Sequence, residues 1–193
     1  MKLESKHEPV TGQVNVPVRM VREDLDAIPV FEVPEGYSLR WYEEGDAVHW
    51  MRIHQTCEGY AKLSPSLFED QYGADVSTLS ERIAFLCRED GLAVSTNTAW
   101  MSDWKGGNWG RVHWVATDRQ EQGKGLSKPL MTQICHRLRD LGHACAYLTT
   151  NTLRVRAISL YADFGFKAYW ETEKEEAAWS ELREKLREIG REV

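Results

Sequence analysis

Two glycines close together, Gly123 and Gly125, mark the segment whose chemistry is easiest to anticipate. They lie in the run VATDRQEQGKGL, residues 115–126, between an apolar segment expected to form a strand and one expected to form a helix. Glycine lets the backbone approach a ligand closely and adopt conformations that a Cβ forbids. The unpaired N–H groups and the dipole at the start of the helix then favour an anion, commonly a pyrophosphate. The run therefore predicts an anion-binding loop, to which Lys124 adds charge at the rim.

Two well-known nucleotide-binding loops do not match this run. It is neither the Walker pattern Gly-x-x-x-x-Gly-Lys-Ser/Thr nor the dinucleotide pattern Gly-x-Gly-x-x-Gly. A glycine pair before a helix also occurs in plain tight turns, so the loop by itself leaves its ligand open.

His113 is a candidate proton acceptor close to this loop. It lies two residues before Val115 in an expected strand, so the two side chains should point to the same face. Histidine titrates near neutral pH and can accept a proton directly or through water. The competing interpretation is a core histidine with satisfied hydrogen bonds. Asp103 and Glu58, both in expected loops, are weaker candidates for the same role.

Three of the eight tryptophans, Trp100, Trp104 and Trp109, crowd the region before the loop. They could form an aromatic wall for an apolar or cationic acceptor. They could equally fill the core and fix the register of a hairpin. The sequence leaves both interpretations open.

The elements that position these residues follow from apolar periodicity and turn formers. We expect strands at 37–42, 82–88, 92–101, 111–117, 144–149 and 167–170. We expect helices from Asp46 to about Cys57, from a cap at Ser64, after the glycine loop as far as Gly142, over 155–164, and from Glu173 onward.

Two further local patterns predict turns and an edge. Asp90-Gly91 between apolar runs favours a type I′ hairpin. Val14, Val16 and Val18 alternate with other residues, and because Pro17 lacks an N–H they indicate a weak edge strand.

The chain divides into three expected segments. Residues 1–36 read as an N-terminal extension, 37–170 as one folded domain, and 171–193 as an amphipathic C-terminal helix. That helix carries an apolar face that could pack on its own domain, dock a partner, or form a homodimer; its members are Trp179, Leu182, Leu186 and Ile189.

Composition narrows the classes of function. The formal net charge of −6 argues against a surface that binds nucleic acid by neutralising phosphates. No apolar run is long enough for a membrane helix, and we expect no membrane partner. The four cysteines lack zinc or redox spacing, so we expect reduced thiols, no metal site and a cytoplasmic protein.

Two motifs together resemble a known family. Gln120-x-x-Gly123-x-Gly125 resembles the Gln/Arg-x-x-Gly-x-Gly/Ala signature of the GNAT N-acetyltransferase superfamily. Residues 157–166, AISLYADFGF, resemble its second signature, a helix with Ala-Ile-x-Leu-Tyr that closes on Gly-Phe. The resemblance covers roughly residues 37–170, and the two motifs stand in the expected order and separation.

The resemblance implies the fold class and the cofactor. The fold would be α/β (α+β), with a mixed, twisted, mostly antiparallel sheet that is flanked by helices and splays into a V holding acetyl-CoA or another acyl-CoA. The pantetheine arm would bond the backbone of Val115 and Thr117. The pyrophosphate would meet the loop through Gln120, Gln122, Gly123, Lys124, Gly125, Leu126 and the Ser127 hydroxyl.

The resemblance also implies a reaction. An amine of a small molecule would attack the thioester directly in a ternary complex, and Tyr161 would protonate the departing thiolate. The alternative for Tyr161 is a packed helix tyrosine. Arg154 stands where the family commonly has an Asn, although Asn151 lies one turn earlier; both are candidates for cofactor contact. A non-catalytic acyl-CoA-binding or protein-interaction module is the alternative function.

Overall fold

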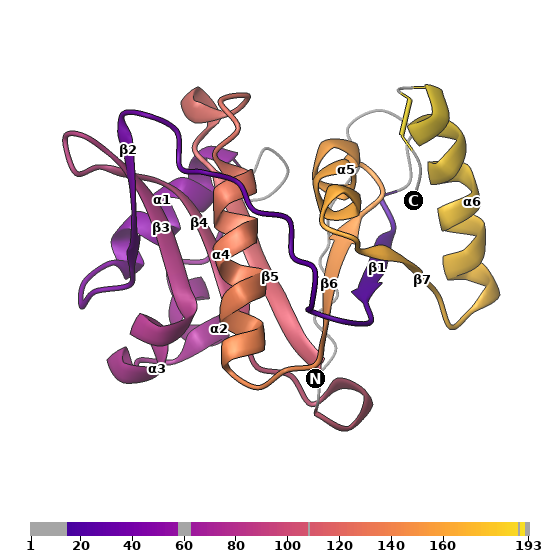
Figure 1. Ribbon diagram of the computed structural model, residues 1–193, viewed down its shortest axis with the longest axis horizontal. Helices are drawn as coiled ribbons and strands as arrows, with labels where there is room; N and C mark the ends of the chain where they lie inside the picture. The colour runs from indigo at the N-terminus through magenta and orange to yellow at the C-terminus, as the bar shows by residue number, and fades with distance from the viewer. Residues whose placement is uncertain (1–14, 58–62, 108, 189, 192–193) are drawn as a thin grey trace.

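The computed structural model describes residues 15–57, 63–107, 109–188 and 190–191. Within them one sheet has the order β2-β3-β4-β5-β6-β1-β7 (Figure 1). Its strands are β1 (Pro17–Arg22), β2 (Tyr37–Trp41), β3 (Ile83–Arg88), β4 (Ala93–Trp100), β5 (Trp109–Thr117), β6 (Cys145–Asn151) and β7 (Lys167–Tyr169). The helices are α1 (Ala47–Cys57), α2 (Leu67–Tyr72), α3 (Val76–Arg82), α4 (Ser127–Asp140), α5 (Val155–Asp163) and α6 (Glu173–Glu188), with short 3₁₀ turns η1 (Trp104–Gly106) and η2 (Arg119–Glu121).

The sheet is antiparallel except where β5 meets β6. These two strands run parallel and pair only through Trp109–Cys145, Gly110–Ala146 and Arg111–Tyr147. Beyond that point they diverge, as Figure 1 shows, and the sheet opens into two halves. The predicted fold class, a mixed and mostly antiparallel sheet with a C-terminal helix, is confirmed.

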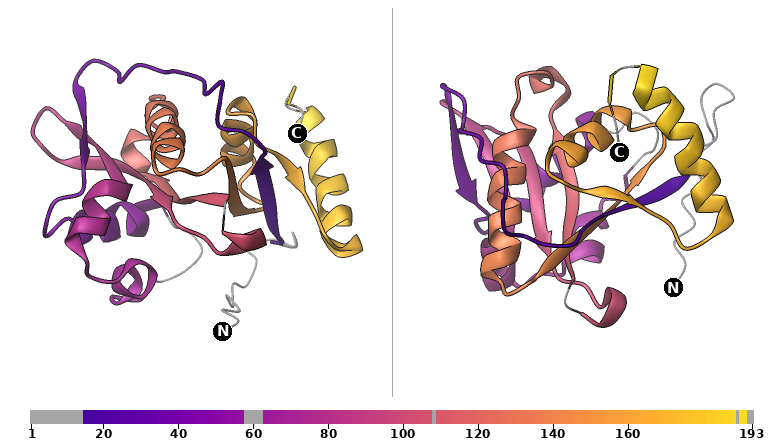
Figure 2. Two further views of the ribbon diagram at one scale, coloured as in Figure 1. Left: turned by 60° about the horizontal axis from the view of Figure 1, so that its bottom comes forward. Right: turned by 45° about the vertical axis from the view of Figure 1, so that its right-hand side comes forward.

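Helices cover both faces of the sheet. Leu130, Ile134 and Leu138 of α4 are buried in the larger core, which also takes in α5 and α6. A second core lies on the other face and is built around Trp50 of α1 and Phe68 of α2. Figure 2 (left) shows α4 and α5 on one side of the sheet and α2 and α3 on the other.

The N-terminal strand corrects one prediction. β1 is not an edge strand, because it pairs antiparallel with β6 on one side and with β7 on the other. Pro17 stands at the first position of the strand, where a missing N–H is tolerated. The five residues after it have their N–H groups and pair normally. Residues 17–22 thus belong to the sheet although they precede the expected domain start, while Val14 lies outside the described residues.

Three local predictions also differ from the structure. The β3–β4 turn has a positive φ only at Gly91, and Gly91 N–H donates to Arg88 O, so it is not type I′. α2 begins at Leu67, three residues after the expected cap Ser64. α3 was not predicted, although Asp75 caps it by accepting from Ser77 N–H at 3.1 Å.

The C-terminal helix packs on its own chain. Its apolar face, which includes Trp179, Leu182 and Leu186, is buried in the larger core. The Trp179 indole donates to Tyr169 O at 3.1 Å. The described part of the predicted docking face is therefore covered within this chain, and Ile189 lies outside the described residues.

Trp179→Ala should lower the free energy of unfolding by about 3–5 kcal/mol, because it leaves a large cavity and an unpaired Tyr169 carbonyl. Urea denaturation measures the change. Glu181→Ala on the exposed side of the same helix is the control and should change it by less than about 0.5 kcal/mol. Equal stability of the two variants would contradict the packing role of α6.

Candidate functional site

The glycine loop follows β5 directly and leads into α4. Gly123 and Gly125 have φ values of 83° and 79°, which L side chains rarely adopt. A Cβ added at either position would meet no atom within 4 Å, so the space in front of both is open. The loop therefore exposes backbone at the end of β5, next to the start of α4, as an anion site requires.

The buried carboxylate of Glu121 links the glycine loop to β2 through hydrogen bonds. Glu121 is buried and accepts hydrogen bonds from Lys124 Nζ at 2.7 Å and Tyr37 Oη at 2.5 Å. The Lys124 bond is the first cause that lowers the pKa of Glu121, and the Tyr37 bond follows. The Lys124 side chain is thus exposed, as a position at the rim requires, and its amino group is paired with Glu121.

Hydroxyl and amide groups tie the end of β5 to the loop. Thr117 Oγ1 lies 2.7 Å from Ser95 Oγ and 3.2 Å from Ser127 Oγ. The Gln122 side chain donates to Thr117 O at 3.2 Å. The Asp118 N–H faces β4, where it donates to Val94 O at 2.8 Å. Because strand residues alternate, the backbone groups of Thr117 face the other way, toward the side where β6 no longer pairs.

A bulge in β5 was not predicted. His113 pairs with Thr98 and Ala116 with Thr96, so Trp114 and Val115 together oppose Asn97. Trp114 has a φ of 53°, a strained conformation for a bulky residue. Such strain persists only where the surroundings enforce it, and it concentrates at functional sites.

Three side chains hold Trp114 in this conformation. Its indole donates to Gln71 Oε1 at 3.0 Å, and the rings of Trp50 and His54 lie 5.2 and 5.0 Å from it, edge to face. His54 is buried and hydrogen-bonds the Trp114 backbone, while its Nε2 has no partner. Burial, followed by the charge of Arg154, lowers the pKa of His54 to about 3, so its imidazole is neutral. Neither Gln71 nor His54 carries a sequence signal that links it to β5.

The bulge overturns the expected relation between His113 and Val115. Because of the extra residue the two side chains lie on opposite faces: Val115 packs with the α4 core, and the His113 ring lies 5.8 Å from Tyr72 of α2. His113 Nε2 lies 3.1 Å from Gln71 Oε1, which already accepts from Trp114. An amide oxygen only accepts, so His113 Nε2 carries the proton and Nδ1 is the basic nitrogen. Burial is the main cause that holds the pKa of His113 well below its usual range, followed by the charge of Arg111.

The other half of the sheet contributes α5 and the end of β6. Tyr161 is buried in the larger core, and burial raises its pKa to about 12, so the phenol keeps its proton at neutral pH. Arg154 is exposed at the start of α5, and its N–H donates to Asn151 O at 2.9 Å. Its positive charge contributes to the pKa of both His54 and Tyr161, after the larger effect of burial in each case.

The predicted aromatic wall divides into two clusters. The ring centroid of Trp100 lies 4.8 Å from that of Tyr72 of α2. Trp104 instead lies 5.0 Å from Trp109 and 4.6 Å from Tyr147 of β6. Of the two weaker base candidates, Asp103 is exposed just before η1, and Glu58 lies outside the described residues.

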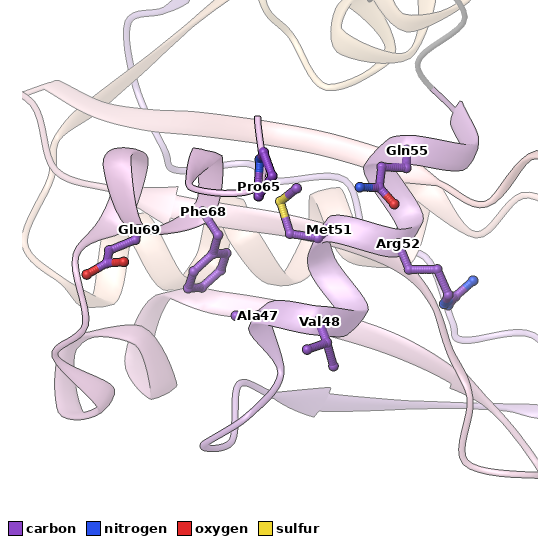
Figure 3. A pocket seen from close by; sticks show the side chains of 8 residues that line it. All are labelled: Ala47, Val48, Met51, Arg52, Gln55, Pro65, Phe68 and Glu69. Atoms are coloured by element: carbon purple, nitrogen blue, oxygen red, sulfur yellow. The ribbon is translucent and has the colours of Figure 1, made fainter. Parts of the chain in front are cut away.

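A surface hollow of about 430 Å³ lies between α1 and α2 (Figure 3). Its lining contains no predicted site residue and consists of Ala47, Val48, Met51, Arg52, Gln55, Pro65, Phe68 and Glu69. Among the described residues no cluster of histidine, cysteine and acidic side chains could hold a metal ion. A search of the same residues finds no helix that could cross a membrane.

Comparison with known proteins agrees with this geometry. The family model described as "Acetyltransferase (GNAT) family" matches residues 46–166. A GCN5-related N-acetyltransferase from Sphaerobacter thermophilus superposes with a TM-score of 0.64 at 20% identity, over 80% of this chain and 50% of that one. A GCN5-related N-acetyltransferase from Kribbella flavida superposes with a TM-score of 0.53 at 16% identity, over 79% of this chain and 54% of that one. Glucosamine-6-phosphate N-acetyltransferase from Arabidopsis thaliana superposes with a TM-score of 0.52 at 16% identity, over 72% of this chain and 96% of that one.

These identities show a shared fold and no more. The chain spans about half the length of the Sphaerobacter protein. No curated protein matches the sequence.

Replacing Gly123 or Gly125 by alanine should cost about 1–2 kcal/mol of unfolding free energy each, because alanine is strained at these φ values although it clashes with nothing. Urea denaturation measures the cost. Arg119→Ala, at an exposed position of the same loop, serves as control and should be neutral. A fully stable glycine variant would mean that the loop relaxes to another conformation.

Proposed function

Because the chain belongs to the acetyltransferase (GNAT) family, we propose that it transfers an acetyl group from acetyl-CoA to an amine of a small molecule. One observation carries the proposal: β5 loses its pairing with β6 after Arg111, and the open glycine loop lies at the diverging end. A strand edge thus stands next to an anion-binding loop. Pantetheine and pyrophosphate need these two surfaces side by side.

The cofactor contacts divide between backbone and side chains. The backbone of Val115 and Thr117 would bond the pantetheine arm, replacing the missing strand neighbour. The amides from Gln122 to Leu126, with the Ser127 hydroxyl, would receive the pyrophosphate. Lys124 acts indirectly, since it fixes Glu121 and with it the loop. Arg154 and Asn151 approach from the other half, where the Arg154 charge suits a phosphate.

The reaction needs a polarised thioester and two proton transfers. The amine nitrogen attacks the thioester carbon, the C–N bond forms, the C–S bond breaks, and sulfur takes the electron pair. Backbone N–H groups released from the ladder at the Trp114 bulge would stabilise the oxyanion. The neutral Tyr161 phenol donates a proton to the thiolate. His113 accepts the amine proton at Nδ1, directly or through water.

The first test is calorimetric titration with acetyl-CoA. The wild type should bind saturably, and a Gly123→Glu, Gly125→Glu double variant should not, because two carboxylates would occupy the anion site. Gly73→Glu, Gly91→Glu is a matched control, since both glycines also have positive φ and open surroundings. It should bind like the wild type. A folded wild type that binds no acetyl-CoA would overturn the proposed function.

Tyr161→Phe should lower kcat by about 10²–10⁴-fold with little change in KM for acetyl-CoA, because it removes a proton donor and leaves the packing intact. Steady-state assays with any amine that the wild type acetylates measure the effect. Tyr42→Phe, a buried tyrosine in the second core, is the control. An unchanged kcat in Tyr161→Phe would remove the acid role from this residue.

A further inference from the structure

Arg111 lies where the two halves of the sheet meet. It is the last residue of β5 that pairs with β6, opposite Tyr147, and it pairs with Trp100 of β4 on the other side. Its guanidinium carbon is 5.9 Å from the Tyr147 ring. Its positive charge also contributes to lowering the pKa of His113 and that of Tyr72 of α2. The side chain therefore lies on the α2 face of the sheet, at the base of the split.

The Arg111 guanidinium has no carboxylate partner among the described residues. The side chain is half-buried, and its Nε is fully buried without a hydrogen bond. Within the described part of the chain, Arg111 makes no ion pair and no hydrogen bond through its side chain. By contrast Arg19, Arg40 and Arg52 each pair with a carboxylate. Leaving a partly desolvated cation unpaired costs free energy that an arriving anion would recover.

The surroundings strengthen an ionic contact at this point. Aromatic residues come from both halves of the sheet: Trp100, the β4 residue paired with Arg111, has its ring 4.8 Å from that of Tyr72, and the Tyr147 ring of β6 lies 5.9 Å from the guanidinium carbon. Aromatic walls exclude water and lower the local dielectric, so a charge pair is worth more here than at an open surface.

We propose that Arg111 binds an anionic group, a carboxylate or a phosphate, on the amine acceptor. The inference rests on the proposed function and defines its substrate class. Arg111 precedes the Trp114 bulge by three residues, about 10 Å along a strand. The amine and the anion of the acceptor should therefore be separated by at most about 10 Å. Arg111 would thus select the acceptor and orient its amine toward the thioester.

Paired acceptors test the inference. We would compare kcat/KM for glucosamine 6-phosphate with glucosamine, and for 6-aminohexanoate with its amide, at saturating acetyl-CoA. At least one anionic member should exceed its neutral partner about tenfold or more. Arg111→Gln should reduce that preference by about 10- to 100-fold, because a charged hydrogen bond is lost. The phosphate and carboxylate pairs together identify which anion is recognised.

Matched variants separate this role from folding. Arg111→Lys keeps the charge and should retain part of the preference, whereas exposed Arg187→Gln on α6 should change nothing. Thermal unfolding checks that all three variants fold. A wild type that acetylates neutral and anionic members equally, or a preference that survives in Arg111→Gln, would overturn the inference while leaving the proposed function intact.

A second experiment tests anion binding without requiring catalytic turnover. Inorganic phosphate and acetate are titrated against the wild type saturated with CoA, while the Arg111 Nε–H resonance is followed by ¹⁵N NMR. Saturable shifts of this resonance, with no shift of the Nε–H of exposed Arg187 on α6, support the anion site even if no tested amine is acetylated. Shifts that do not saturate would contradict it. Failure to bind CoA in the same sample would instead count against the proposed function.

Discussion

The shortness of the β5–β6 pairing is the constraint on which the rest of the structure depends. Three residue pairs join the two strands, and every backbone group beyond Arg111 on that side of β5 must find another partner. The Gln122 side chain supplies one by donating to Thr117 O. The remaining groups face the side where β6 no longer pairs. A ligand that extends along β5 can therefore bind as a missing strand does, with little demand on side-chain identity.

Several features keep the strands together at one end and apart at the other. Gly110 lies at the joined end, where a Cβ would come within 2.7 Å of the Leu138 side chain on α4 and would force it to shift. The bulge at Trp114 adds twist to β5 as it leaves β6. β6 is held instead by β1, which also pairs with β7 and so ties the second half to the N-terminal segment. The split is thus built into the sheet rather than into a mobile loop.

What the sequence predicted correctly was local, and what it missed was tertiary. The glycine loop and the α4 pattern of Leu130, Ile134 and Leu138 depend on residues close in sequence, and the structure has both. The place of β1 depends on strands more than a hundred residues away. The bulge depends on Gln71 and His54, which no spacing rule connects to Trp114. Because the bulge went unseen, strand alternation gave the wrong face for His113.

On the proposed function, two arginines explain how an acidic chain would bind anionic ligands. The net charge of −6 is global, whereas Arg111 and Arg154 act locally on the groups beside the split. Burial is the main cause that lowers the pKa of His113 and of His54, and the charges of Arg111 and Arg154, respectively, lower it further. Both imidazoles are therefore neutral before any ligand arrives. On the proposed function, an anion bound at Arg111 would offset its charge and raise the pKa of His113, although burial would still hold that pKa below its usual range. The imidazole would then be a stronger base when the acceptor is in place, which couples recognition of the acceptor to removal of its proton.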